Sequence, residues 1–243
     1  MINSVRQTVQ ALLNKHNYGY LSPGDFNLFA RKAQMDLFTE YFSFLNRAIN
    51  AENQRMSGTE YADISKQLKE AIEVFSVPDY TLTYTVDNVY TLPNNVYLLN
   101  SVRYIPTPGT VGVWYTSDYN REVEKVSNSN ITALNSSNLT APSAEFPAYT
   151  LSGNSLYLYP SSIAGSNKLK AEYIRFPVNP KWTYASLSGG EPIFNPSAGD
   201  YQDFELPLDD EPKLVVRILN MAGLSIREPE VIAATTAQQQ TNQ

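Results

Sequence analysis

The strongest constraint on the fold is a change in the spacing of apolar residues at Pro78. Before Pro78, apolar side chains recur at intervals of three and four residues, the period of a helix with one buried face. After it, apolar and polar residues alternate, as in half-buried strands. The sequence therefore predicts an α+β protein with a helical N-terminal bundle, a central and mostly antiparallel β domain, and helices again at the C-terminal end.

This change of period and later shifts in composition suggest four segments. We expect a helical region at 1–77, a β-rich domain at 78–184, a linker at 185–207, and C-terminal helices with a polar tail at 208–243. The 243 residues, of which 42% are hydrophobic, suffice to build a sizeable core.

A long helix is the clearest element of the first region. Ser22 is a good N-cap, Pro23 suits the first helical position, and Asp25 lies near the positive end of the helix dipole. An apolar stripe then continues at helical spacing through Phe26, Ala30, Ala33, Leu37, Tyr41, Phe44 and Ala48. Further apolar positions widen the stripe: Phe29, Phe38, Phe42, Leu45 and Ile49. We expect a helix of about thirty residues, or about 45 Å, with more than one face covered.

Two shorter helices are expected on either side of it. Asn3 or Ser4 can cap the first, and Gly19 ends it. Its apolar positions are Val5, Val9, Leu12 and Leu13. The other follows a break at Ser57 and Gly58, with an apolar side of Tyr61, Ile64, Leu68, Ala71, Ile72 and Phe75.

The central region contains eight short runs with strand character. They are 80–86, 89–92, 96–105, 111–115, 122–126, 148–151, 155–159 and 168–176. Gly153 and Asn154 indicate a hairpin turn between two of them. The polar segment 127–147 is long for a connection inside a compact domain, which suggests a functional or partner-ordered loop.

The third region is expected to end in helices. Residues 185–199 are rich in Gly, Ser and Pro and are typical of a linker. Pro212, preceded by acidic residues, suits a helix start, and Gly223 suits its end. The apolar face comprises Leu214, Val215, Ile218, Leu219 and Ala222. Pro229 can open a last helix whose Thr- and Gln-rich continuation is frayed or docked on another subunit.

Composition excludes several classes of function. The net charge of −6 argues against dominant DNA binding, although such a surface suits a conduit through which DNA slides. The chain has no cysteine, so it forms no disulfide and has no thiolate nucleophile. We also find no apolar run of signal-peptide length at the N-terminus and none of about 20 residues elsewhere, so we expect no membrane span.

The residues that catalysis would need are sparse. His16 is the single histidine and has no companion motif, so we expect no Ser-His-Asp arrangement. Glu122 and Glu124 share one face of a predicted strand and are the pair that a glycosidase could use, but a solvated strand face is the simpler interpretation. Gly189 and Gly190 lack the context of a phosphate-binding loop. We therefore expect no catalytic residues and no enzymatic activity.

Metal and cofactor sites are also not expected. A dense acidic cluster comprises Asp200, Asp203, Glu205, Asp209, Asp210 and Glu211. It could hold a hard cation, yet no calcium-loop spacing is present, and a helix N-terminal charge bias with an acidic interface patch explains it more simply. Glycosylation triplets at Asn130, Asn135 and Asn138 are interpreted as chance matches in a polar loop.

The aromatic residues leave two functions open. Trp114, Trp182 and many of the 17 tyrosines could stack on sugars or bases, as in a carbohydrate-binding or adhesive module of an outer tail. Tyrosine at alternating strand positions is more often packing and interface material, which favours a structural subunit.

Five segments together resemble a family of phage proteins. They are 18–42 (YGYLSPGDFNLFARKAQMDLFTEYF), 90–104 (YTLPNNVYLLNSVRY), 151–160 (LSGNSLYLYP), 169–182 (LKAEYIRFPVNPKW) and 204–240 (FELPLDDEPKLVVRILNMAGLSIREPEVIAATTAQQQ). Their pattern is similar to the head-to-tail adaptors of podoviruses, the tail tubular protein A and neck-ring proteins, including those of crAss-like bacteriophages.

The resemblance implies a structural virion protein made in the bacterial host cytoplasm. Such proteins form a homo-oligomeric ring, a dodecamer, in the neck between the portal protein and the tail, around the channel through which genome DNA leaves without sequence-specific binding. The family has no catalytic, cofactor or metal residues to transfer. In a closed ring each subunit presents two different complementary faces, and the aromatic helix suits such an interface.

Overall fold

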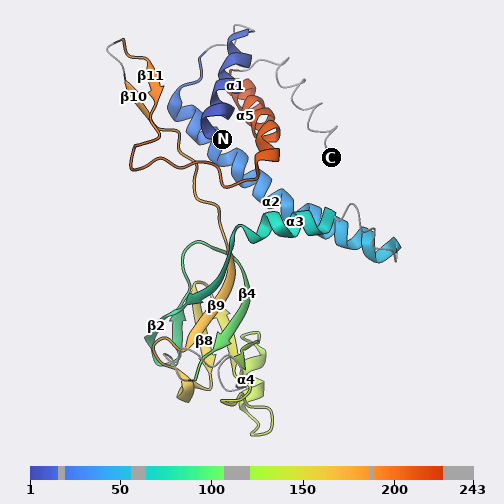
Figure 1. The fold of residues 1–243 in the computed structure, drawn as a ribbon. Helices are drawn as coiled ribbons and strands as arrows, with labels where there is room; N and C mark the ends of the chain where they lie inside the picture. The colour runs from blue at the N-terminus through green and yellow to red at the C-terminus, as the bar shows by residue number, and fades with distance from the viewer. Residues whose placement is uncertain (16–19, 56–63, 107–120, 187–188, 227–243) are drawn as a thin grey trace, which may run out of the picture. The chain divides into compact units, whose positions relative to one another are not determined.

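The computed structural model describes residues 1–15, 20–55, 64–106, 121–186 and 189–226 (Figure 1). The chain forms two compact units, residues 1–74 with 177–243 and residues 75–176. Helices lie towards both ends of the chain and a largely antiparallel β unit lies between them, so the predicted α+β class is confirmed. Several expectations lie outside the described residues: Gly19 as a helix end, the break at Ser57 and Gly58, the strand at 111–115, and the helix and tail from Pro229 onward.

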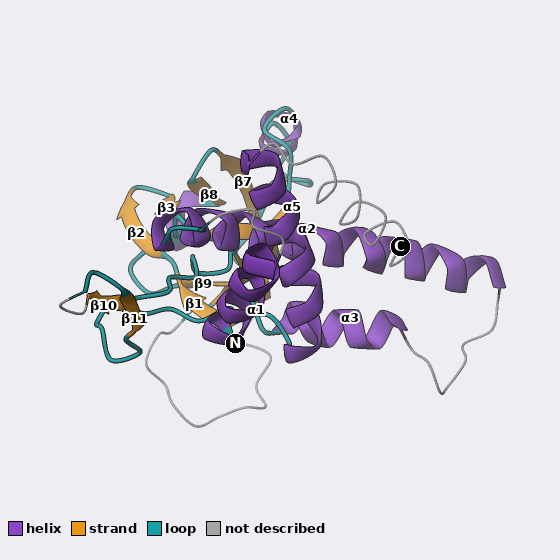
Figure 2. Cartoon of the chain, turned by 90° about the horizontal axis from the view of Figure 1, so that it is seen from above, coloured by secondary structure: helices purple, strands orange, loops and turns teal. Residues whose placement is uncertain are grey.

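The helical unit is built from α1 (Ile2–Lys15), α2 (Pro23–Arg55), α3 (Ile64–Glu73) and α5 (Glu211–Ile226). Helix α5 packs against both α1 and α2, and α3 lies beside the second half of α2 (Figures 1 and 2). The predicted apolar face of α5 is buried throughout: Leu214, Val215, Ile218, Leu219 and Ala222. This unit therefore combines segments from the two ends of the sequence.

The start of α2 follows the predicted cap. The Ser22 hydroxyl accepts a hydrogen bond from the Asp25 backbone N–H at 3.1 Å and donates one to the Asp25 carboxylate at 2.6 Å. Pro23 is the first helical residue, where its missing N–H costs nothing. The helix has 33 residues, a length of about 50 Å.

Helix α1 begins earlier than predicted because its cap comes from a distant part of the chain. The Asp203 carboxylate accepts hydrogen bonds from the Ile2 backbone N–H at 2.7 Å and from the Met1 ammonium group at 2.9 Å. Asn3 and Ser4, the expected caps, therefore lie inside the first turn of the helix. A carboxylate at this end of a helix is favoured by the helix dipole.

The C-terminal end of α5 also differs from the prediction. Gly223 is buried inside α5, which continues to Ile226. Glycine lowers helix stability by about 1 kcal/mol relative to alanine but does not end a helix that tertiary packing supports. At the other end of α5, the turn η2 (Leu208–Asp210) precedes the helix. Pro212 is its second residue, close to the predicted start.

The β unit contains two sheets. The strands of the first are β1 (Ser76–Thr81), β4 (Val96–Tyr104), β5 (Arg121–Glu122) and β9 (Leu169–Arg175), in the order β1-β9-β4-β5. The second has the order β2-β3-β8-β7-β6 and comprises β2 (Thr83–Val86), β3 (Val89–Thr91), β6 (Glu124–Lys125), β7 (Ala148–Ser152) and β8 (Ser155–Tyr159). All pairs in these two sheets are antiparallel except β6 with β7.

Two predicted strands cross from one sheet to the other. The run 80–86 divides at Leu82 into β1 and β2, and the run 122–126 divides at Val123 into β5 and β6. Both corner residues are buried, and each N–H donates to the first sheet, Leu82 to Leu169 O and Val123 to Val102 O. Strands that change sheets in this way form the corners of a packed sandwich. Because β1 continues into β2 and β5 into β6, both pairs of end strands are joined and the two sheets form a closed order of strands.

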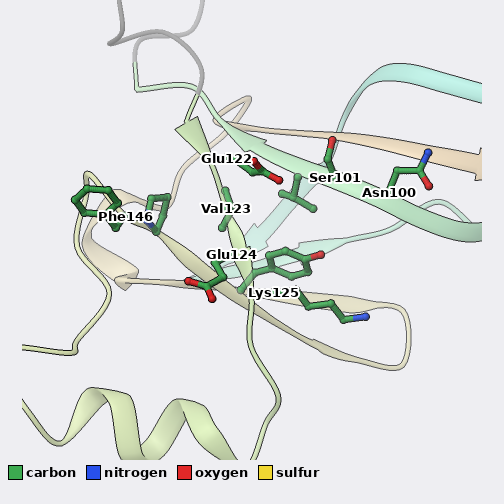
Figure 3. A pocket seen from close by; sticks show the side chains of 10 residues that line it. Asn100, Ser101, Glu122, Val123, Glu124, Lys125 and Phe146 are labelled. Atoms are coloured by element: carbon green, nitrogen blue, oxygen red, sulfur yellow. The ribbon is translucent and has the colours of Figure 1, made fainter. Parts of the chain in front are cut away.

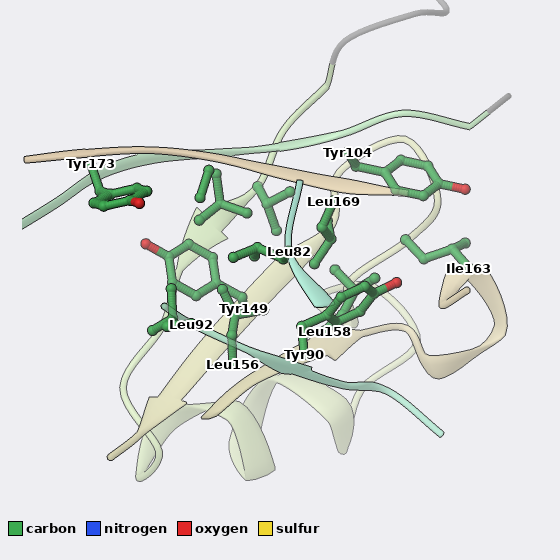
Figure 4. Packing of buried hydrophobic residues seen from close by; sticks show 13 residues of the cluster. Leu82, Tyr90, Leu92, Tyr104, Tyr149, Leu156, Leu158, Ile163, Leu169 and Tyr173 are labelled. Carbon is green, nitrogen blue, oxygen red and sulfur yellow. The ribbon is translucent and has the colours of Figure 1, made fainter. Parts of the chain in front are cut away.

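The inner faces of the two sheets form one core. It includes both corner residues together with tyrosines and leucines from five strands (Figure 4). Tyr90 is fully buried, and its hydroxyl donates to Gly165 O at 2.8 Å and accepts from Gly165 N–H at 2.9 Å. A tyrosine at such a position supplies apolar area while its hydroxyl remains satisfied.

The hairpin at Gly153 and Asn154 is confirmed. It joins β7 and β8 with Ser152 opposite Ser155, and Gly153 has φ +59°. A glycine in this conformation suits the first central position of a type II′ turn.

The predicted loop 127–147 is more ordered than expected. It contains the short helix α4 (Asn130–Asn135), whose Ile131 is buried. Side-chain hydrogen bonds, such as Asn128 Nδ2 to Leu151 O at 3.0 Å, attach it to β7. The polar composition therefore reflects local hydrogen bonding by Ser, Thr and Asn rather than an absence of structure.

The segment 185–207, expected as a linker, carries a small hairpin instead. Strand β10 (Tyr184–Ser186) pairs with β11 (Pro192–Phe194) in a sheet of their own. The base of the hairpin rests on Trp182, which is stacked with Tyr184 and Phe194. Aromatic packing thus orders this segment, although its glycine and serine content indicated a linker.

Within the part of the chain that the structure describes, no helix is both long enough and apolar enough to cross a bilayer.

Candidate functional site

A groove of about 380 Å³ lies at the corner where β5 continues into β6 (Figure 3). Its volume is within the range of small ligand-binding sites. One wall is formed by β4, and the other by the corner strand and the chain that enters β7. The lining residues are Asn100, Ser101, Val102, Glu122, Val123, Glu124, Lys125, Phe146, Pro147 and Tyr149.

The two glutamates that the sequence singled out both line this groove, but not on one face of one strand. Glu122 belongs to β5 and lies opposite Arg103, whereas Glu124 belongs to β6 and lies opposite Ala148. The buried Val123 between them turns the chain from one sheet to the other, so the expectation of a shared strand face is wrong. Figure 3 shows the two carboxylates leaving the corner in different directions.

Strand β4 contributes residues that sequence reasoning missed. Its pairing with β9 has two irregularities, one between Val96 and Leu98 and one between Leu99 and Ser101. The second leaves Asn100 as an extra residue, and Asn100 lines the groove. Bulges often redirect a side chain beside a site. Two consecutive leucines before Asn100 interrupt the alternation and were the available signal.

Phe146 is the other missed residue. Its side chain is 79% exposed although it lines the groove. The surrounding turn is held by hydrogen bonds in both directions, from Phe146 N–H to Ser143 Oγ and from Ser143 N–H to Phe146 O, each 3.2 Å. Single exposed apolar side chains are common on protein surfaces, so Phe146 is of interest here because it lines the groove.

The electrostatics of the groove suit binding better than acid–base catalysis. Both glutamates are exposed, whereas a glycosidase acid is kept neutral by an apolar setting. Tyr149 lies at the buried side of the groove, where burial raises the pKa of its hydroxyl and the Glu122 charge raises it further. The tyrosine therefore stays neutral, and the carboxylates are left to attract cations or accept hydrogen bonds.

The acidic cluster does not form a site, because five of its six members engage separate partners. Asp203 caps α1, and Glu205 accepts the Val178 N–H at 2.7 Å. The other contacts pair Asp200 with Lys181, Asp210 with Tyr41 and Lys213, and Glu211 with Ser4. Among the described residues, no three His, Cys, Asp or Glu side chains gather as a metal site would require.

Trp182 is a structural residue. It is only 2% exposed, its indole N–H donates to Asn3 Oδ1 at 3.1 Å, and the Arg6 guanidinium lies 3.8 Å from its ring centroid. It therefore offers no sugar-stacking surface. Trp114 and His16 lie outside the described residues.

The remaining flagged positions are exposed. Asn130, Asn135 and Asn138 lie in and after α4, and Gly189 and Gly190 lie between β10 and β11. Nothing within 4 Å of either glycine would meet an added Cβ, so neither position marks a close backbone approach to another group.

A scan against protein-family models and a search of curated proteins both found no match to this sequence.

Proposed function

We propose that this chain is a structural subunit of a tailed bacteriophage, in which copies form a ring in the neck between portal and tail. The ring would surround the channel through which the genome leaves the capsid. The resemblance of the sequence to podovirus adaptors motivates the proposal, and one observation on α2 supports it most directly.

That observation is incomplete burial of the second half of α2. In the first half the apolar positions are largely covered: Phe26, Ala30, Ala33, Leu37, Phe38 and Tyr41 are all buried, and Phe29 is partly buried. The stripe then continues through Phe42, Phe44, Leu45 and Ile49, which are only partly buried. Here α3 lies beside α2 (Figure 2). We call α3 together with α2 from Phe42 onward the helical arm.

The helical arm has the chemistry of an interface between subunits. Aromatic and aliphatic side chains that stay partly exposed along a helix are enriched where proteins associate. A cyclic ring needs two different complementary faces on each subunit, and the helical arm can supply one of them. The net charge of −6 also fits a channel through which DNA slides rather than one that binds it.

The proposal is tested by locating the protein and by changing the helical arm. Immunogold labelling of purified virions is expected to mark the neck; a protein absent from virions would contradict the proposal. Phe44→Asp should abolish incorporation into the neck because it places a charge in the interface. Asn46→Asp, two residues away at an exposed position, is the matched control and should be incorporated normally.

A carbohydrate-binding or adhesive module of the outer tail is the alternative. Trp182 gives it no support because that side chain is buried. Its remaining support is the exposed Phe146 beside polar groove residues, which a neutral saccharide could contact. Binding of maltohexaose with loss on Phe146→Ala would favour this alternative.

A further inference from the structure

The groove at the corner between β5 and β6 contains a buried tyrosine whose hydroxyl is not used by the fold. Tyr149 is 4% exposed, and its ring belongs to the core of the β unit (Figure 4). No described residue forms a hydrogen bond with its hydroxyl. Tyr90 in the same core differs, because its hydroxyl is bonded twice to Gly165. Buried polar groups normally have a partner, so the Tyr149 hydroxyl is available to a ligand.

This hydroxyl borders the groove. Among the described residues, the enclosed side-chain atoms that lack a partner are Arg6 Nε and Arg103 Nε. The Tyr149 hydroxyl is not one of them, so it reaches open space, and Tyr149 lines the groove. The charge of Glu122, which is also in the lining, raises the pKa of this hydroxyl. The two groups are therefore near each other at the buried side of the groove.

The rest of the lining supplies further hydrogen-bonding groups. Four exposed side chains form no hydrogen bond or ion pair with any described residue: Asn100, Glu122, Glu124 and Lys125. The amide and the ammonium group can donate, and the carboxylates can accept. Phe146 adds an exposed aromatic ring on the chain that enters β7. The groove thus combines one apolar surface with donors and acceptors.

The charges at the groove do not select a charged ligand. The lining contains two carboxylates, Glu122 and Glu124, and the Lys125 ammonium group. Arg121 and Glu145 beside it add one charge of each sign. The remaining excess is one negative charge at the surface, where solvent and salt screen its attraction for a cation. An anion would be repelled by both carboxylates of the lining. The mixture therefore favours a neutral ligand with many hydrogen-bonding groups.

An extended peptide fits this site poorly. The pairing of β4, which borders the groove, is irregular between Val96 and Leu98 and again between Leu99 and Ser101. Such irregularities interrupt the row of backbone donors and acceptors that an added strand would need. The volume of about 380 Å³ is near the lower end of the roughly 300–1,000 Å³ found for ligand pockets, which suits a small ligand.

We propose that the groove binds a neutral saccharide, with one sugar ring against Phe146 and a sugar oxygen bonded to the Tyr149 hydroxyl. A sugar ring has an apolar C–H face, which packs on an aromatic ring, and hydroxyls that both donate and accept. The two glutamates accept from these hydroxyls, while the Asn100 amide and the Lys125 ammonium group donate to them. The inference concerns the β unit and does not depend on ring formation.

The test titrates the full chain with the methyl glycosides of glucose, galactose, mannose and N-acetylglucosamine, and with maltohexaose. Binding is followed by saturation-transfer difference NMR, which observes the saccharide and works for a single chain and for a ring. We expect saturation transfer to at least one of these saccharides. Its affinity should change little between low and high salt, because no ion pair is formed.

Two tyrosine variants separate a ligand contact from a structural contact. Tyr149→Phe removes only the unpaired hydroxyl, so it should weaken binding about threefold to tenfold and leave the urea unfolding midpoint unchanged. Tyr90→Phe is the matched control. It removes a hydroxyl that is bonded to Gly165, so it should lower the midpoint and leave binding unchanged.

A second pair of variants tests the aromatic surface. Phe146→Ala should weaken binding about tenfold, because the sugar ring loses the surface on which it packs. Leu139→Ala is the control: this side chain is 93% exposed, lies in the same segment before β7 and is not part of the lining, so its loss should not affect binding.

Three outcomes would overturn the inference. They are no saturation transfer to any of the saccharides at roughly 20 mM, unchanged binding by Tyr149→Phe, and a fall in the unfolding midpoint of Tyr149→Phe as large as that of Tyr90→Phe. Salt-sensitive binding of N-acetylarginine amide, with none of the saccharides, would assign the groove to a cationic side chain instead. Localisation in virions decides separately whether the chain is a neck subunit, so the two proposals can fail independently.

Discussion

Replacing Trp182 with alanine should strongly destabilise the helical unit. The side chain is 2% exposed and connects three segments. Its indole N–H donates to Asn3 Oδ1 at 3.1 Å, and the Arg6 guanidinium lies 3.8 Å from the ring. Its backbone N–H donates to Asn27 Oδ1 at 2.8 Å, and its carbonyl accepts from Asn27 Nδ2 at 3.1 Å. Trp182 thus holds the segment after the β unit against α1 and α2.

The size of the effect follows from these contacts. Truncating a buried tryptophan to alanine costs about 3–5 kcal/mol. Arg6 would lose its aromatic partner while its buried Nε already has no hydrogen-bond acceptor, so we expect about 4 kcal/mol, near the upper part of that range. Trp182→Phe keeps most of the apolar area but leaves Asn3 Oδ1 without a donor, at a cost of about 2 kcal/mol.

Urea unfolding followed by circular dichroism at 222 nm is the assay, because nearly all of the described helix belongs to the helical unit. Tyr184→Ala is the control: this residue stacks on Trp182 but is half exposed, and its loss should cost about 1 kcal/mol. An unfolding free energy for Trp182→Ala within about 1 kcal/mol of the unchanged chain would refute the role assigned to Trp182.

Three further predictions concern ionisation and backbone conformation. Burial alone would raise the pKa of Asp203, but hydrogen bonds from the Met1 ammonium group and from backbone N–H groups outweigh it and lower the pKa. The ionised Asp203 carboxylate therefore stabilises the fold above about pH 4, and this stabilisation is lost as the pH falls through the folded-state pKa. Asp203→Asn should remove this loss of unfolding free energy at acidic pH, as measured by urea titrations at a series of pH values. Burial, with the hydrogen bond to Asp210, raises the pKa of Tyr41. The neutral Tyr41 hydroxyl therefore stabilises the fold below about pH 10, and this stabilisation is lost at higher pH. Tyr41→Phe should cost about 2 kcal/mol at neutral pH and reduce the alkaline loss, whereas an unchanged alkaline unfolding profile would contradict this. Gly153→Ala should destabilise the β unit by about 1 kcal/mol, because Gly153 has φ +59° and a side chain is strained in that conformation even though the added Cβ would meet no neighbouring atom. Gly189→Ala is the control: Gly189 lacks a positive φ, so the thermal melting curve should be unchanged.

Local signals in the sequence located most elements because they act over a few residues. Three such features depend on residues that are close in sequence: the cap at Ser22, the apolar stripe of α2 and the turn at Gly153. Each is a property of a short segment, and each appears in the structure at its predicted place.

The elements that were missed depend on distant residues. The cap of α1 comes from Asp203, about two hundred residues away, and no periodicity can reveal it. At Leu82 and Val123 the alternation of apolar and polar residues continues although the chain passes from one sheet to the other. Strands β1 and β2, and likewise β5 and β6, were therefore predicted as single strands. The hairpin at 184–194 is ordered by packing on Trp182, although its composition indicates a spacer.

The candidate groove was only half visible in the sequence. Glu122 and Glu124 were singled out as a pair because they alternate with an apolar residue, but Asn100 and Phe146 join them only through a bulge and a folded turn. Which side chains meet at a corner depends on the pairing of strands far apart in sequence, and alternation alone does not determine that pairing.

The division of the helical unit between the two ends of the chain sets an order of events during synthesis. Helices α1 to α3 leave the ribosome first, but α5 and the Asp203 carboxylate follow only after the whole β unit has been made. The β unit is continuous in sequence and can fold as soon as it has emerged. Until α5 has also emerged, the apolar face of α2 lacks the helix that covers it. A nascent chain stalled before residue 211 should therefore be the form most dependent on chaperones.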